Sequence, residues 1–240
     1  MAEEYSFPPY GERLKKIIDK FGGKKMETYN GEDVTRLWDM KGGGISWSYK
    51  YLYSAPKLEK IVFSEQSYRD KLMTYTALAW PDDQHALPIF SSFWAESAKG
   101  SYVIIDLYPT ADCICDLPYM EKYLDPLEDF YDRSVKDFPE KPNRDLAWFR
   151  TFVSAYGIRL DLHESTKDSQ EKILQLTTDY FEHYYNIWEK DEPRDPGYMK
   201  SLNERKEAIR QIMKDRDPGG AMLVNAVGDE LAELSLKALF

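Results

Sequence analysis

Asp217 is the carboxylate whose position in the sequence is best suited to chemistry. It stands in RDPGGAML, where Asp-Pro precedes a helical pattern that runs to the end of the sequence. An aspartate at this position can cap the helix by accepting backbone N–H groups, and a carboxyl group can also transfer a proton. The two roles compete, because N–H donation to a carboxylate lowers its pKa. The local sequence alone favours the cap.

Asp106 and Arg159 are two further candidates, each placed late in a strand-like run. Asp106, in SYVIIDLYP, shares a strand face with Tyr102, Ile104 and Tyr108. A carboxylate among aromatic rings is either paired with a cation or has a raised pKa. Arg159, in YGIRL, would suit a carboxylate ligand if its guanidinium pointed inward. Exposure at a strand end explains either residue equally well.

Other kinds of site find little support in the sequence. The three histidines, His85, His163 and His183, have no metal-binding spacing, and Cys113 and Cys115 form a CxC pair rather than two CxxC pairs. The sequence has no GxSxG motif, and the glycine run at 42–44 lacks the GK[ST] ending of a phosphate loop. We therefore expect no metal and no nucleophilic hydrolysis.

Composition limits the partners. The 240 residues carry 32 Lys and Arg against 42 Asp and Glu, a net charge of −10, with no long basic run, which argues against nucleic acid or an anionic membrane as the main partner. Aromatic residues reach 15%, which indicates a need for flat amphipathic surface. No segment has the length and apolar character of a membrane span or a signal peptide. Two cysteines indicate a reducing compartment, and we expect a cytoplasmic protein, or a stromal one in a plastid.

The elements that must position these residues follow from periodicity. Apolar residues at helical spacing predict a helix at 11–21, a weaker one at 32–40, a single helix within 118–139 and helices from 163 to the end. Alternating or short apolar runs predict strands at 45–54, 58–64, 72–80, 87–95, 101–108 and 151–160. Closely spaced strands pair as antiparallel meanders. We predict one domain over residues 1–240, an α/β protein in which helices flank a central antiparallel sheet in a three-layer α/β/α sandwich.

Five segments together resemble the ferredoxin-dependent bilin reductases. They are YLYSAP (51–56), ALAWPDDQHALPIF (77–90), SYVIIDLYPT (101–110), FVSAYGIR (152–159) and DPGGAMLVNAVGDELAELSLKALF (217–240). The resemblance covers roughly residues 45–240 and implies a fold that holds an open-chain tetrapyrrole between the sheet and the C-terminal helices. It also implies that no metal or flavin is bound. Single electrons would come from a small acidic iron–sulfur ferredoxin, and side chains would supply protons through a substrate radical.

The resemblance assigns roles residue by residue. Asp217 matches the family's C-terminal catalytic aspartate, which raises its functional interpretation above the cap. Arg159 matches an arginine that contacts a propionate, and Ser101 matches a serine that lines the pocket. Asp106 matches the aspartate of a DLxP turn, which is more structural than catalytic.

Two positions depart from the family pattern, and a third depends on strand register. Phe93 stands where the family has Asp or Asn, and Thr76 stands where it has His, Asp or Asn. A phenyl ring transfers no proton, and a threonine hydroxyl is at best a relay. The family's upstream glutamate falls near Ser64 or Glu65, and a one-residue slip reverses the face. We assign catalysis to Asp217 and, second, to Glu65, with Thr76 and Phe93 lining the pocket.

The sequence therefore predicts ferredoxin-dependent reduction of a linear tetrapyrrole, biliverdin or a close relative. Two alternatives stay open: reduction of an open-chain chlorophyll catabolite, which a Glu65–Asp217 pair in the pocket would favour, and a non-catalytic tetrapyrrole carrier, which Thr76 and Phe93 favour. A basic patch for ferredoxin would draw on four residues and would be sensitive to salt. These are Lys57, Lys60, Arg69 and Lys71.

Overall fold

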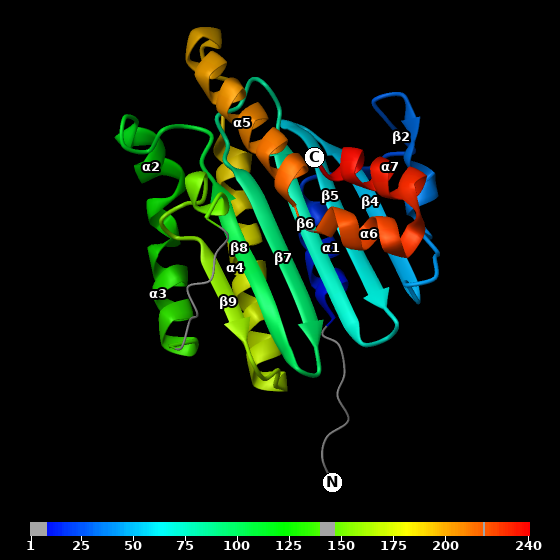
Figure 1. Cartoon of the computed structure of the whole chain (residues 1–240). Coiled ribbons are helices and arrows are strands. Elements are labelled where there is room, and N and C mark those ends of the chain that lie inside the picture. The colour runs from blue at the N-terminus through cyan, green and yellow to red at the C-terminus, as the bar shows by residue number, and fades with distance from the viewer. Residues whose placement is uncertain (1–8, 140–146, 218) are drawn as a thin grey trace.

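One antiparallel sheet organises the chain (Figure 1). The computed structural model describes residues 9–139, 147–217 and 219–240. Within these ranges a seven-stranded sheet has the order β1-β4-β5-β6-β7-β8-β9, and every neighbouring pair is antiparallel. The strands are β1 (Lys24–Lys25), β4 (Trp47–Ala55), β5 (Leu58–Tyr68), β6 (Leu72–Pro81), β7 (Ile89–Ser97), β8 (Gly100–Tyr108) and β9 (Ile158–Leu162). A separate hairpin pairs β2 (Thr28–Tyr29) with β3 (Glu32–Asp33).

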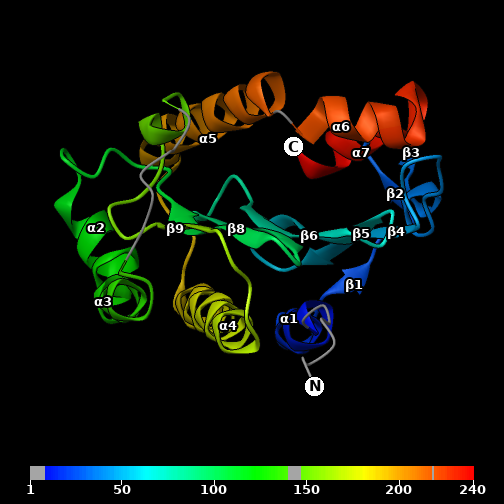
Figure 2. The same cartoon turned by 60° about the horizontal axis from the view of Figure 1, so that its bottom comes forward.

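Helices cover both faces of this sheet, which confirms the predicted three-layer α/β/α sandwich (Figure 2). One face carries α1 (Tyr10–Lys20) and α4 (Lys167–Lys190), with α2 (Leu117–Tyr123) and α3 (Glu128–Asp137) beside α4. The other face carries α5 (Pro196–Arg216), α6 (Gly219–Val227) and α7 (Asp229–Leu239). None of the helices in the described ranges combines the length and the apolar character that crossing a bilayer requires.

Strand alternation divides the core into two clusters. In β5, Ile61 and Phe63 pack toward α1 and α4, whereas Val62 packs with residues of α5 and α7. All three side chains are at most 3% exposed, and burial of each such side chain is worth about 1.5–3 kcal/mol. Because successive side chains point to opposite faces, each of the strands β4 to β8 contributes to both clusters.

Several predicted elements are shorter or broken. Residues 32–40 contain β3 and a 3₁₀ helix (Val34–Leu37) rather than an α-helix, and the expected strand at 151–160 begins only at Ile158. The single helix expected within 118–139 is interrupted by a 3₁₀ turn (Asp125–Leu127) at Pro126, which has no N–H to continue the helix. The C-terminal helix breaks at Gly228, whose φ of 86° lies in the left-handed region that favours glycine.

The glycine run at 42–44 is a packing feature rather than a phosphate loop. A Cβ at Gly42 would lie 1.8 Å from the Ala226 carbonyl oxygen, and one at Gly44 would lie 3.4 Å from the Ala226 Cα. Only residues without side chains allow this loop and α6 to approach so closely. The loop therefore supports α6, the helix that lies above β5 and β6 (Figure 2).

Candidate functional site

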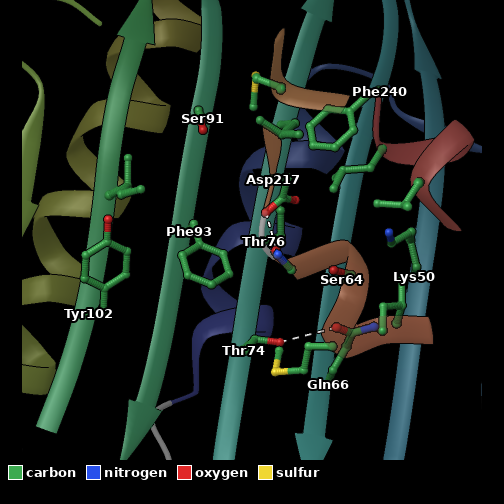
Figure 3. Close-up of a pocket in the computed structure, with 18 of the residues that line it drawn as sticks. Lys50, Ser64, Gln66, Thr74, Thr76, Ser91, Phe93, Tyr102, Asp217 and Phe240 are labelled. Atoms are coloured by element: carbon green, nitrogen blue, oxygen red, sulfur yellow. Dashed lines mark hydrogen bonds between the residues drawn. The ribbon is translucent and has the colours of Figure 1, made fainter. Parts of the chain in front are cut away.

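A cavity of about 430 Å³ lies between the sheet and the C-terminal helices (Figure 3). Its volume is in the range of small-molecule sites. Side chains of β4 to β8 line the sheet side, and residues from 148 to 149 and from the end of α5 onward line the remainder. The C-terminal part of the lining consists of Met213, Asp217, Gly219, Met222, Leu223, Leu236, Leu239 and Phe240.

One row of paired residues crosses the sheet beneath this cavity. Lys50 pairs with Ser64, Ser64 with Thr76, Thr76 with Phe93, and Phe93 with Ile104. Residues paired in register point to the same face, so all five side chains point into the cavity, and all five line it. Thr76 and Phe93 therefore line this cavity, and contact between them and a substrate stays a prediction.

Aromatic rings and hydroxyl groups give the cavity a mixed surface. The rings of Phe93 and Tyr102 meet edge-on with centroids 6.3 Å apart, and the ring of Tyr108 meets that of Phe149 in the same way at 5.8 Å. The Tyr108 hydroxyl donates to Ser91 Oγ at 2.9 Å. Rings of this kind can contact a flat conjugated ligand, while hydroxyls can bond its polar edge.

Asp217 lies at the wall of the cavity, where α5 gives way to α6. Its Oδ1 accepts the backbone N–H of Gly219 at 2.8 Å, and its side chain is partly exposed and lines the cavity. The residue thus acts as a cap for the start of α6 and also faces the site. The two interpretations of Asp217 are compatible in space, because a carboxylate has a second oxygen.

Lys50 is the cavity residue that sequence reasoning missed. It is 3% exposed, and its Nζ donates to the Ser235 carbonyl oxygen at 2.9 Å and to Ser235 Oγ at 2.6 Å. Burial lowers the pKa of the ammonium group to about 7, and the negative charge of Asp217 opposes that shift. The signal in the sequence was a lysine within a strand, on the face opposite the aromatic residues.

Ser101 does not line the cavity, contrary to the prediction. Its hydroxyl donates to Glu96 on the opposite face of the sheet, under α4. Glu96 is fully buried and also accepts from Trp94 Nε1 at 2.8 Å and from Gln170 Nε2 at 2.9 Å. The next residue along β8, Tyr102, occupies the cavity face. The error is one strand position, which is enough to reverse the face.

Arg159 lies beside the cavity rather than in its lining. It pairs with Ile104 and so belongs to the cavity face. Its guanidinium donates to Asp106 Oδ2 at 3.0 Å and lies 5.3 Å from the ring centroid of Phe149, which lines the cavity. The two strand-end candidates of the sequence are therefore partners of each other. Contact between Arg159 and a propionate stays a prediction.

Asp106 has the environment of a structural anchor. Its carboxylate is fully buried and accepts the Ser154 N–H at 3.1 Å and the Ser154 hydroxyl in addition to the arginine bond. Burial raises its pKa to about 6, against the opposing effect of Arg159. These contacts join β8 to the segment that leads into β9.

Comparison with known proteins bears on the identity of the fold. The family model for ferredoxin-dependent bilin reductases matches residues 15–240. The chain belongs to this family.

No curated protein sequence matches this chain. Among solved structures, it is similar to phytochromobilin synthase from tomato, which was crystallised in complex with biliverdin. The two share 16% sequence identity and superpose with a TM-score of 0.81, and the match covers 95% of this chain and 80% of the tomato protein. At this identity the likeness establishes the fold.

The register decides which residue of this chain faces the cavity at the position of the upstream glutamate. Ser64 faces the cavity, whereas Glu65 pairs with Tyr49 and Tyr75 on the opposite face, beneath α1. A Cβ on Gly11 of α1 would lie 2.5 Å from Glu65 Oε1. The structure therefore does not bring Glu65 to Asp217, so the predicted pair is not formed.

Within the described ranges, no group of three or more His, Cys, Asp or Glu side chains is placed so that it could hold a metal ion.

Glu65 instead makes stability depend on pH. Burial raises its pKa from 4.5 to about 7, so the folded protein binds more protons than the unfolded chain between these values. Stability should therefore fall as pH rises from about 4.5 to 7. We expect Glu65→Gln to be more stable than wild type by roughly 1–3 kcal/mol at pH 8, and equal to it near pH 4, in urea unfolding. Glu121→Gln, an exposed change in α2, is the control and should leave the pH dependence intact. Wild-type stability that does not vary over this window would contradict the assignment.

Proposed function

We propose that this protein reduces a linear tetrapyrrole, biliverdin or a close relative, with electrons from reduced ferredoxin. The observation that carries the proposal is the cavity on the sheet face, because it combines aromatic surface for a flat pigment with the Asp217 carboxyl at its wall. Family membership and the biliverdin bound to the tomato protein support the same substrate class. We propose no resident metal or flavin.

Each double bond reduced requires two electrons and two protons. In the proposed reaction two reduced ferredoxins each give one electron, through a substrate radical, and side chains of the cavity give the protons, which they recover from water. Asp217 is proposed as the principal proton donor. Arg159 lies at the edge of the cavity. We propose that its guanidinium exchanges the Asp106 carboxylate for a propionate when the ligand binds.

The four basic residues that the sequence predicted as a ferredoxin patch are not all free to bind a partner at the surface. Lys57 Nζ donates to the carbonyl oxygens of Trp188 and Asp191, at 3.0 and 2.6 Å, at the end of α4, and Lys60 is fully buried. Arg69 and Lys71 are exposed at the turn between β5 and β6. Electrostatic docking of an acidic ferredoxin would therefore need exposed cations other than Lys57 and Lys60, and could still include Arg69 and Lys71.

A carrier function is the second candidate. It rests on one observation: Ser64, Thr76 and Phe93, which stand on the sheet face of the cavity at the family's titratable positions, carry no side chain that titrates near neutral pH. The chlorophyll-catabolite alternative depended on a Glu65–Asp217 pair in the cavity. That pair is not formed, so this alternative loses its support.

An absorbance experiment separates the reductase from the carrier. Purified protein is incubated with biliverdin without oxygen, and spectra are recorded before and after reduced ferredoxin is added. We expect a bound-pigment spectrum that shifts to shorter wavelength through a radical intermediate. Binding without change on reduction would favour the carrier, and a failure to bind would leave the family assignment without its proposed substrate.

A further inference from the structure

We propose that Lys50 is the second proton donor of the cavity and that Asp217 is the first. This inference rests on the proposed function. The family resemblance assigns no role to this position. The inference comes from the place of Lys50 in the cavity, the bonds that hold its ammonium group, and the charges around it.

Lys50 and Asp217 are the charged side chains among the described residues that line the cavity. The row of paired residues under the cavity begins at Lys50 and continues through Ser64, Thr76 and Phe93, none of which exchanges a proton near neutral pH. Figure 3 shows Lys50 and Asp217 projecting into the same space from different elements, one from β4 and one from the end of α5. A ligand that fills this space would lie against both.

Ser235 holds the ammonium group in place. An ammonium has three N–H donors, and in the described structure Ser235 accepts two of them, through its carbonyl oxygen and its hydroxyl. Ser235 lies in α7 and is itself fully buried. This arrangement fixes the direction of the side chain and leaves one N–H to point toward a ligand in the cavity.

The surroundings of Lys50 bring the pKa of its ammonium group close to neutral pH. Burial lowers its pKa to about 7, the carboxylate of Asp217 at the end of α5 raises it, and α7 presents the neutral Ser235. Lys60, buried in β5 on the same face, is a second cation whose charge interacts with that of Lys50. At neutral pH both the ammonium and the amine are therefore populated, as a group that must give up a proton and regain it requires.

The proton balance of the step is complete. Two electrons from two reduced ferredoxins and two protons convert one C=C of the tetrapyrrole into two C–H bonds or their N–H tautomers. Asp217 gives one proton and becomes a carboxylate, and the Lys50 ammonium gives the other and becomes an amine. Water reprotonates both before the next turnover.

Three variants separate proton donation from charge and from folding. Lys50→Met has a similar length and no proton to give. Lys50→Arg keeps the charge but has a pKa above about 12, so it is a poor donor near pH 7. Lys237→Met is the matched control, because Lys237 lies in α7 two residues beyond Ser235, partly exposed, in ion pairs with Glu233 and Glu32.

Turnover with biliverdin and reduced ferredoxin is measured from pH 5.5 to 9, with pigment binding followed by absorbance. We expect wild-type turnover to fall above about pH 7, as the ammonium deprotonates. This alkaline limb of the pH profile should be absent in Lys50→Met. Turnover of Lys50→Met and Lys50→Arg should be at least roughly tenfold below wild type at pH 6.5 with binding retained, and Lys237→Met should match wild type. Wild-type turnover in Lys50→Arg, or a limb that persists in Lys50→Met, would overturn the inference. Absence of the limb in wild type overturns it without any variant.

A binding measurement distinguishes this failure from failure of the proposed function. If wild type binds biliverdin but does not reduce it, the proposed function fails. The absorbance of the bound pigment is then titrated, and a transition near pH 7 that is lost in Lys50→Met would still show proton exchange between Lys50 and the ligand. Identical titrations of the two proteins would overturn the assignment of Lys50, and a wild-type protein that binds no biliverdin would overturn both proposals together.

Discussion

Replacement of Asp217 by asparagine is expected to lower turnover with biliverdin and reduced ferredoxin by roughly 10²-fold or more. Asparagine keeps the size of the side chain and the oxygen that accepts the Gly219 N–H, so the start of α6 should remain capped. It cannot give up a proton near neutral pH. The expected loss therefore isolates proton donation from the structural role that the local sequence favours.

Asp215→Asn is the matched control for this experiment. Asp215 lies two residues earlier, is exposed, and accepts a hydrogen bond from Gln211 Nε2 at 2.8 Å on the surface of α5. It should retain wild-type turnover, and both variants should bind biliverdin with unchanged absorbance. Turnover of Asp217→Asn within a few-fold of wild type would remove Asp217 from the mechanism and return it to the role of a cap.

Replacement of Asp106 by alanine should give the largest loss of stability, about 3–5 kcal/mol in urea unfolding. The substitution leaves the Arg159 guanidinium, which is 14% exposed, without the carboxylate that it bonds at 3.0 Å, and it removes the acceptor of two Ser154 donors. For a chain of this length the loss corresponds to a fall in Tm of roughly 10 °C.

Two further variants identify the cause of that loss. Ser154→Ala removes one donor and keeps the ion pair, so it should cost only about 1 kcal/mol. The double variant Asp106→Leu with Arg159→Met removes both charges and should recover a large part of the stability, because the penalty comes chiefly from a buried guanidinium that has lost its carboxylate. A double variant as unstable as Asp106→Ala would show that the loss comes from packing instead.

The elements of the fold were largely predictable because each depends on local periodicity. Alternation in 45–54 and in the later strand runs required a half-buried sheet, and the three- and four-residue spacing after 163 required helices that cover it. The breaks were less predictable. Gly228 divides the last helix through a single left-handed residue, and Pro126 divides the middle one.

Face assignment is where the sequence failed in the site. Ser64 and Glu65 are adjacent, as are Ser101 and Tyr102, and only one of each pair can face the cavity. A period of two shows that a strand has two faces, but it does not say which set of helices covers which face. That choice is made by packing between layers, so Glu65 and Ser101 were assigned to the wrong side.

The burial of Lys50 likewise depends on which face of the sheet the helices cover. Trp47, on the aromatic face of its strand, is 41% exposed, whereas Lys50, on the other face, is 3% exposed. The cavity face is buried because α7 crosses over β4 and Ser235 there satisfies the ammonium group.

The sequence by itself determined most of the strands and helices, the family and the candidacy of Asp217, because these depend on the order and spacing of residues along the chain. The tertiary structure alone decided that Asp106 and Arg159 are partners, that Glu65 lies under α1, and that Lys50 lies in the cavity. These depend on which residues of distant segments meet once the helices have packed on the sheet, and the free energy of burying a charge is decided only at that contact.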